Sequence, residues 1–339
     1  MKGVVLLGEG ELAVREFEDP IPECGEVVVR TKVAGICGSD IHMYHSPKKW
    51  HEGRPEMAAG HEPAGVVESV GETVTLVKPG DRVSVYHYIG CGKCTRCLAG
   101  FRQWCRDAKG LGVATHGAHA DFVLVPEDNC YVLPDELSFI DGAFMACGAG
   151  TTYSALAKLR PNGTSSLAVF GLGPVGLAGV MMAKAMGARV VAIGRRECRL
   201  TLAREFGADY IVDVDDPDAP ATIKGLFPRG VDMVYETSGA PEAQAYMLRM
   251  LKRGGEACIV AGKKGDNGID AGTIIGKQLT IRGSFVLPIW MVPQMAAFIV
   301  RHRLPFEKMV THRFSIDQAA EAFKLFDSGE CGKVVFEWP

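Results

Sequence analysis

Four cysteines lie close together in the first third of the chain: Cys91, Cys94, Cys97 and Cys105. Four thiolates in one short segment can form a closed tetrahedral shell around Zn²⁺. Because a closed shell leaves no position for a substrate, we expect this zinc to be structural. An iron–sulfur cluster is the competing interpretation, but bacterial clusters expect a shorter last gap followed by proline, and Arg106 follows here. Unligated cysteines are the third possibility.

A second set of potential metal ligands is dispersed along the chain, at Cys37, His61 and Cys147. Taken singly, a lone cysteine or histidine of this kind more often belongs to the core. Together the three offer what a catalytic zinc needs, which is three protein ligands and one open position. The sequence therefore predicts a second, catalytic zinc site, and two zinc ions per subunit.

Three polar residues follow Cys37 within one short segment: Ser39, Asp40 and His42. Asp40 is available to orient the imidazole of His61, as carboxylates commonly do behind metal-bound histidines. Ser39 and His42 can pass a proton from a metal-bound alcohol to solvent. We expect all three to support the catalytic zinc.

A glycine turn occurs at Gly171-Leu172-Gly173-Pro174-Val175-Gly176, between an apolar run and a helical stretch. It matches G-x-G-x-x-G, in which the three glycines permit the tight turn, the approach of a pyrophosphate and close helix–strand packing. The helix N-terminus then faces the anion. The strand–turn–helix context favours a dinucleotide site, whereas the motif alone is weak.

The end of the next expected strand carries Gly194-Arg195-Arg196. Dinucleotide sites for NAD usually have an acid here that binds the adenosine ribose. No acid is present, and two arginines stand where a 2′-phosphate would lie. We therefore expect NADP rather than NAD, with a solvated basic loop as the alternative.

The elements that must position these residues change in character near residue 150. The earlier part is rich in Gly, Pro and short β-type runs, with a turn signal at 78–81. Strands are predicted there at 27–33, 65–70, 81–85 and 121–125. The later part alternates strand-like runs at 167–170, 189–193, 210–212, 231–235, 257–261 and 279–281 with helical stretches such as 177–186 and 200–206. This alternation predicts an α/β fold with a parallel, doubly wound sheet.

Composition excludes several classes of protein. The 339 residues suggest two domains, and 47% apolar with 23% charged residues is typical of a globular chain. A net charge of −3 argues against nucleic-acid or anionic-membrane binding. The uncharged run 161–183 is long enough to span a bilayer, but its five glycines and one proline favour a buried strand, turn and helix. With no secretory leader pattern at the start, we expect a cytoplasmic protein.

These motifs resemble those of the zinc-dependent medium-chain dehydrogenases/reductases, the alcohol dehydrogenase superfamily, and within it the polyol and threonine dehydrogenase branch. Residues 35–42, 60–67, 91–105 and 171–176 carry the resemblance, which covers essentially the whole chain. It implies a GroES-like β-rich catalytic domain, 1–149 and 292–339 with a structural zinc lobe at about 88–106, around a Rossmann domain, 150–291. It also implies that the C-terminal strand rejoins the catalytic domain, and that the protein is a homo-oligomer, a tetramer or a dimer.

The resemblance assigns roles to further residues. Cys37, His61 and Cys147 match catalytic zinc ligands, and Glu62 matches an acid that can enter the zinc shell during turnover. In the polyol branch that acid is itself a ligand and the third position is often Glu or Asp, so the resting ligand set stays open. Thr151 matches a position beside the nicotinamide. Lys333 matches a basic residue near the cofactor phosphates, with a plain surface lysine as the alternative.

The expected reaction is reversible hydride transfer between a small alcohol and NADP. Five polar or aromatic residues are candidates for the substrate pocket: Tyr44, His45, Trp50, His51 and His87. Their character favours a polyol-like or hydroxy-acid substrate over a long-chain alcohol. A threonine 3-dehydrogenase-like enzyme, an NAD-dependent polyol dehydrogenase and a redox-silent binding protein on the same fold are the alternatives.

Overall fold

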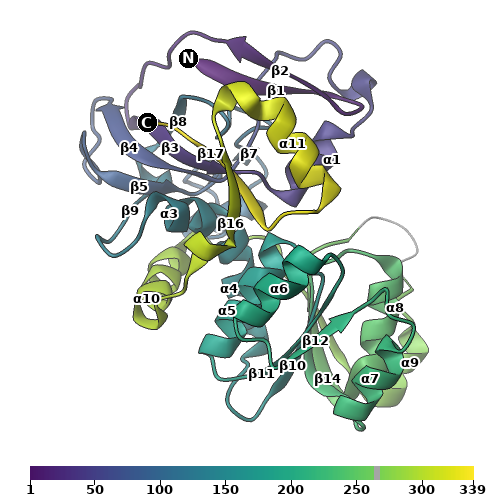
Figure 1. Ribbon diagram of the computed structural model, residues 1–339. Coiled ribbons are helices and arrows are strands. Elements are labelled where there is room, and N and C mark those ends of the chain that lie inside the picture. Colours follow the sequence, from purple (N-terminus) through teal and green to yellow (C-terminus); the bar gives the residue numbers. More distant parts are fainter. Residues whose placement is uncertain (263–267) are drawn as a thin grey trace. The chain divides into compact units, whose positions relative to one another are not determined.

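The computed structural model describes residues 1–262 and 268–339 and divides into two compact units (Figure 1). One unit combines Met1–Gly150 with Leu287–Pro339, and the other is Thr151–Val286. The sequence placed the second boundary at 291/292, five residues later. Hydrogen bonds explain the difference: the Tyr86 hydroxyl donates to the Leu287 carbonyl at 2.8 Å, and the Ile289 N–H donates to the Gly100 carbonyl at 2.9 Å.

The first unit is built on a seven-stranded sheet centred on β3 (Glu26–Gly35). The strand order is β16-β17-β3-β4-β5-β9, and β8 also pairs with β3. Val27, Val28 and Val29 are buried on β3, since β-branched side chains suit a pleated, packed surface. The four strands predicted in this part of the chain form, with ends shifted by no more than two residues.

The strands of the first unit are β1 Lys2–Gly8, β2 Glu11–Glu16, β3 Glu26–Gly35, β4 Pro63–Val70, β5 Arg82–Val85, β6 Tyr88–Ile89, β7 Lys109–Gly110, β8 Phe122–Pro126, β9 Cys130–Val132, β16 Val310–Phe314 and β17 Lys333–Glu337. Its α-helices are α1 Gly38–Tyr44, α2 Thr95–Leu98, α3 Phe139–Ala146, α10 Val292–His302 and α11 Ala319–Ser328, and α4 Gly148–Leu159 leads into the second unit. Short 3₁₀ turns are η1 Lys48–Trp50, η2 Arg102–Trp104, η3 Glu127–Asn129, η4 Ile289–Met291, η5 Phe306–Met309 and η6 Ile316–Gln318.

The C-terminal strand β17 returns to the first unit. It pairs antiparallel with β3, with Val335 opposite Gly35 and Phe336 opposite Ala34 (Figure 1). This pairing agrees with the expectation that the chain end rejoins the catalytic domain. The sequence did not predict the β1–β2 hairpin, whose tight turn places Gly8, Glu9 and Gly10 at positive φ.

The second unit contains a parallel sheet of six strands in the order β12-β11-β10-β13-β14-β15. Numbered from β10, this is the order 3-2-1-4-5-6 of a doubly wound dinucleotide-binding fold. Its strands are β10 Ser166–Phe170, β11 Arg189–Gly194, β12 Tyr210–Asp213, β13 Val231–Glu236, β14 Leu251–Ile259 and β15 Thr280–Gly283, and its helices after α4 are α5 Pro174–Ala185, α6 Glu197–Glu205, α7 Ala219–Leu226, α8 Pro241–Met250 and α9 Ala271–Lys277.

Two features of this unit bear on the sequence predictions. Strand β14 starts at Leu251 rather than 257, because its first residues pair with Val231 before the register shifts. In the described residues, no helix is long and apolar enough to cross a membrane. The uncharged run 161–183 accordingly contains the buried strand β10 and most of helix α5.

Candidate active site and metal centres

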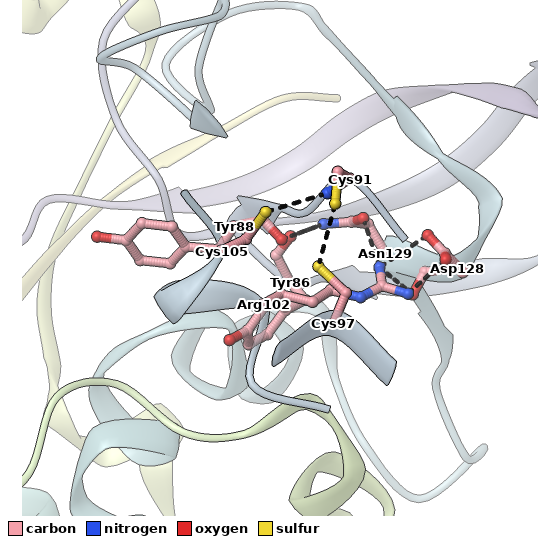
Figure 2. A network of polar contacts seen from close by, with 8 residues as sticks. All are labelled: Tyr86, Tyr88, Cys91, Cys97, Arg102, Cys105, Asp128 and Asn129. Atoms are coloured by element: carbon pink, nitrogen blue, oxygen red, sulfur yellow. Dashed lines mark hydrogen bonds and ion pairs between the residues drawn. The ribbon is translucent and has the colours of Figure 1, made fainter. Parts of the chain in front are cut away.

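The four clustered cysteines converge in the first unit (Figure 2). The Sγ atoms of Cys91 and Cys97 lie 4.0 Å apart, and those of Cys94 and Cys105 lie 3.8 Å apart. Thiolates placed tetrahedrally at about 2.3 Å from Zn²⁺ would be about 3.8 Å from one another, whereas a disulfide would require about 2.05 Å. The spacing therefore fits a closed zinc site. Backbone N–H groups of Lys93 and Cys94 lower the pKa of the Cys91 thiol to about 6, which favours the thiolate.

Arg102 fastens this cysteine lobe to the sheet (Figure 2). Its guanidinium donates to the Asp128 carboxylate at 2.7 Å and to the Asn129 side chain at 2.9 Å. Asn129 in turn donates to the carbonyls of Tyr86 and Tyr88, at 2.6 and 3.0 Å. The lobe is thus held by a connected network as well as by its cysteines.

The dispersed ligands also converge within the first unit. One atom each from Cys37, His61, Glu62 and Cys147 lie within 4.8 Å of one another. Cys37 precedes α1, His61 and Glu62 directly precede β4, and Cys147 directly follows α3. Three element ends, far apart in sequence, therefore supply one cluster.

Asp40 connects two of these elements. Its carboxylate accepts the Cys37 backbone N–H at 2.8 Å, which completes a capping box at the start of α1. The other carboxylate oxygen lies 3.1 Å from Nδ1 of His61. Nε2 of His61 is thereby directed to the cluster, so Asp40 has the orienting role that the sequence predicted.

Glu62 provides direct structural support for a cation. Its Oε1 is buried without any hydrogen-bond partner, while Oε2 forms an ion pair with Lys333. A buried acceptor without a partner is costly, and a metal ion beside the ligand atoms would satisfy it. The residues present therefore fit a bound zinc ion.

The position of Lys333 corrects the sequence interpretation. Its side chain is only 1% exposed, so the surface alternative is wrong. Nζ donates to the Ile36 carbonyl at 2.8 Å in addition to Glu62. The expected contact with cofactor phosphates is not what the structure shows; instead, the ammonium is engaged beside the metal ligands.

The cluster carries an excess of negative charge. A hydrogen bond from Cys147 sets the pKa of the Cys37 thiol well below its ordinary value, and the same bond raises the pKa of Cys147. Burial alone would lower the pKa of His61, but the charges of Asp40 and Cys37 outweigh it and raise that pKa well above its usual value. Burial raises the pKa of Glu62 to about 7, against the opposing charge of Lys333. Such a cluster attracts a cation.

Ser39 lies at this cluster. Its hydroxyl is 3.3 Å from Nε2 of His61, the nitrogen that faces the metal ligands. His42 is one helical turn further along α1, and residues three apart share a helix face. The structure thus places Ser39 beside the cluster with His42 following it on the same helix.

Of the expected substrate-pocket residues, His87 lies next to the cluster. Its ring centroid is 5.2 Å from that of His61. Nδ1 lies 2.6 Å from the Ala146 carbonyl and must donate to it, which leaves Nε2 as a hydrogen-bond acceptor. Burial lowers the pKa of His87 to about 3, so the ring is neutral.

The other four lie elsewhere in the first unit. Trp50 and His51 line a hollow of about 250 Å³ together with Met43 and Met57. Tyr44 packs its ring on Phe323, with centroids 5.4 Å apart, and His45 pairs with Asp327 at 2.9 Å. Both partners belong to α11, so the described contacts of Tyr44 and His45 are with this helix and not with the metal ligands.

The glycine turn of the second unit has the geometry that its motif requires. Gly171 has φ +85°, and an added Cβ would lie 2.8 Å from the Ser238 nitrogen. At Gly176 a Cβ would lie 1.8 Å from the Gly171 carbonyl oxygen, whereas at Gly173 nothing lies within 4 Å. Pro174 and Val175 begin α5, whose N-terminus has no side-chain cap. The open space and the uncapped N–H groups suit a phosphate.

Gly194 ends β11, and Arg195 and Arg196 follow with exposed side chains. A Cβ on Gly194 would lie 2.6 Å from Cγ of Leu172, so a larger residue requires Leu172 to move. Arg196 has φ +74° and precedes α6. Thr151 lies in the first turn of α4. The described contacts assign no ligand to these four residues.

Comparison with known proteins places these sites in a family. Residues 23–135 match the alcohol dehydrogenase GroES-like domain, and residues 174–301 match the zinc-binding dehydrogenase domain. An uncharacterized zinc-type alcohol dehydrogenase-like protein of Escherichia coli is 32% identical over 100% of this chain and 99% of its own. The L-threonine 3-dehydrogenase of Bacillus subtilis is 35% identical over 94% of this chain and 93% of its own.

Solved structures show the same architecture. An alcohol dehydrogenase from Thermus sp. ATN1 has a TM-score of 0.90 at 29% identity and covers 99% of both chains. A dehydrogenase from Sinorhizobium meliloti bound to NADP has a TM-score of 0.87 at 28% identity, over 99% of both chains. An Escherichia coli alcohol dehydrogenase complexed with NADH has a TM-score of 0.89 at 25% identity, over 100% of this chain and 99% of that one. With its two cysteine-containing clusters and its glycine turn, this chain belongs to the zinc-dependent medium-chain dehydrogenases, in the threonine and polyol dehydrogenase-like branch.

Proposed function

We propose that this oxidoreductase, which acts on CH–OH groups, interconverts a small polar secondary alcohol and its ketone with NADP as the cofactor. The observation that carries the proposal is the buried set Cys37, His61 and Cys147 beside the unpartnered Oε1 of Glu62. Such a set suits a catalytic zinc ion because a position remains for the substrate hydroxyl. The substrate is proposed to be polyol-like or hydroxy-acid-like.

Zinc held by Cys37, His61 and Cys147 would supply Lewis acidity that lowers the pKa of a substrate hydroxyl, and the nicotinamide would take the hydride. The chain's own residues supply orientation and proton transfer. Asp40 fixes the His61 ring through Nδ1. Ser39 is proposed to accept the hydroxyl proton at Oγ and to pass it toward the cofactor ribose and His42.

The proposed preference for NADP rests on charge. A 2′-phosphate carries about −1.5 to −2 charges near neutral pH, and an acid at the end of β11 would repel it. Gly194 removes that repulsion, and Arg195 and Arg196 offer forked donors for phosphate oxygens. Each charged hydrogen bond contributes about 1.5–3 kcal/mol, or roughly 10- to 150-fold in affinity.

The cofactor proposal is tested by kcat/KM for NADP and NAD measured side by side. Arg195→Ala is expected to lower kcat/KM for NADP by roughly 10- to 150-fold and to change the NAD value little. Arg196→Asn serves as the second variant, because asparagine tolerates the positive φ at this position. Arg204→Ala, on the exposed side of α6, is the matched control. Equal or NAD-favouring values in the unaltered enzyme would refute the preference.

The substrate class follows from His87. A neutral ring with Nε2 as acceptor, 5.2 Å from the His61 ring, suits a further hydroxyl on the substrate better than an alkyl chain. Oxidation of threonine at C3 is the second candidate, supported by the relatives named L-threonine 3-dehydrogenase. Polyols, sugars, hydroxy acids and threonine assayed with both cofactors would separate the two. Turnover of threonine alone would replace the first proposal by the second.

A homo-oligomeric state, tetramer or dimer, and a cytoplasmic location stay predictions. Light scattering coupled to size-exclusion chromatography measures the first directly. A monomeric mass at micromolar concentration would contradict it.

A further inference from the structure

Lys333 is a fully buried cation placed among the catalytic ligands by the C-terminal strand. It is the first residue of β17, and its Nζ is bonded to Oε2 of Glu62 and to the Ile36 carbonyl. Nζ also lies 5.2 Å from the centroid of the Phe144 ring. Both members of the ion pair are 1% exposed. A buried charge of this kind is kept only where its partner is held accurately.

Gly35 makes this pair possible. A Cβ at this position would lie 2.2 Å from Oε2 of Glu62 and 2.7 Å from Cε of Lys333. Gly35 is also the residue opposite Val335 in the β17–β3 ladder. The sheet register therefore fixes the distance between the lysine and the carboxylate, and the missing side chain provides the space for it.

The carboxylate of Glu62 is divided between two environments. Oε2 is occupied by Lys333, whereas Oε1 has no partner and belongs to the residue grouped with Cys37, His61 and Cys147. A carboxylate free of the lysine would be a strong additional ligand for a metal ion. The lysine therefore competes with a metal for the same side chain.

We propose that Lys333 is a positioning residue that holds Glu62 as a reserve ligand, with one oxygen on Nζ and the other directed to the metal position. The proposal rests on the metal centre of the proposed function, though not on its cofactor or substrate. If Lys333 only neutralises a buried charge, any change that preserves the fold should leave the metal's behaviour unaltered.

The test measures metal retention by the purified holoenzyme, as the rate at which a chelator removes the catalytic zinc. Lys333→Met should slow this loss about 10- to 100-fold, the range typical for groups behind a metal ligand, because Glu62 then becomes a permanent protein ligand. The Co²⁺-substituted variant should show weaker visible absorption, as expected for a higher coordination number. Lys333→Arg should retain the unaltered rate.

Two further variants separate positioning from a loss of folding. Glu62→Gln removes the negative charge, and Lys333→Met added to Glu62→Gln should cause no further change in metal loss, because the lysine acts through the carboxylate. The double variant also avoids an unpaired buried charge. Lys2→Met, which removes an exposed ion pair with Asp317 at 2.9 Å, is the control and should leave the rate unchanged.

Three outcomes would overturn the inference: faster metal loss in Lys333→Met, an unchanged rate with an unchanged cobalt spectrum, or additive effects of the two substitutions. Each of these presupposes that the unaltered protein holds a metal at Cys37, His61 and Cys147. Absence of that metal would instead refute the proposed function, so the two failures are distinguishable.

Discussion

At the scale of single residues, the His61 ring is held at both nitrogens. Nδ1 faces Asp40 at 3.1 Å, and Nε2 lies 3.3 Å from the Ser39 hydroxyl. The hydroxyl is therefore near the atom that would bind the metal. This position is where a proton leaving the substrate would first be accepted.

Replacing Ser39 by Ala should lower kcat by about 10²–10⁴-fold, the usual contribution of a positioned proton acceptor. His42→Ala should cost less, because buffer can replace a group at the outer end of the path. Steady-state kinetics between pH 6 and 9 measure both variants. An unchanged kcat for Ser39→Ala across that range would rule out the proton path.

His87 should make stability depend on pH. Its pKa is about 3 in the folded protein, against about 6.5 in an unfolded chain. Between these values only the unfolded chain binds the proton, so the free energy of unfolding should fall as pH falls, by up to about 1.4 kcal/mol per pH unit.

Urea unfolding between pH 6.5 and 4 tests this slope. His87→Asn keeps a donor for the Ala146 carbonyl but does not titrate, so its free energy of unfolding should fall less steeply than that of the unaltered protein. His302→Asn is the matched control, because this ring is exposed in the folded and unfolded chain alike. Parallel slopes for all three proteins would contradict the assignment.

At the scale of elements, the turn between β10 and α5 separates two roles of glycine. A methyl group at Gly176 would lie 1.8 Å from a backbone oxygen, which cannot move without separating helix from strand. A methyl group at Gly173 meets nothing within 4 Å, and its φ of −66° suits alanine. One glycine therefore serves packing, and the other leaves space for a ligand.

Gly176→Ala should lower the free energy of unfolding by about 1–3 kcal/mol, the usual cost of overpacking. Gly173→Ala should fold normally but bind the cofactor about tenfold more weakly, which is about 1.4 kcal/mol. Urea unfolding and fluorescence titration with NADPH separate the two effects. Unaltered NADPH affinity in Gly173→Ala would show that this turn does not contact the pyrophosphate.

At the scale of the whole molecule, two metal centres occur in one compact unit but are built differently. The structural lobe takes its four cysteines from one short segment and is fastened by Arg102. The catalytic cluster is assembled from three element ends and a strand from the end of the chain. Loss of the first centre should therefore affect folding, and loss of the second should affect turnover.

Metal analysis should find two zinc ions per subunit, and one in each of Cys94→Ser and Cys37→Ser. Cys94→Ser should lower the melting temperature, because a structural metal contributes folding free energy. Cys37→Ser should keep most of the stability and lose turnover. One zinc ion in the unaltered protein, or activity in Cys37→Ser, would disprove the two-site arrangement.

Much of this protein was determined by local sequence. The cysteine lobe, the glycine turn and the alternation of strands and helices depend on neighbours within about 30 residues, where spacing and hydrophobic period act directly. The four predicted strands around β3 and the C-terminal return of β17 agree with the structure for this reason and through the family resemblance.

Only the tertiary structure decided the contacts between distant segments. The Lys333–Glu62 pair joins residues 271 positions apart, and the sequence placed Lys333 elsewhere. Tyr44 and His45 contact α11, although their position after Cys37 pointed to the substrate pocket. Such contacts depend on sheet register and on which helix packs against which face. These are set by the burial of side chains from the whole unit, so spacing along the chain carries no record of them.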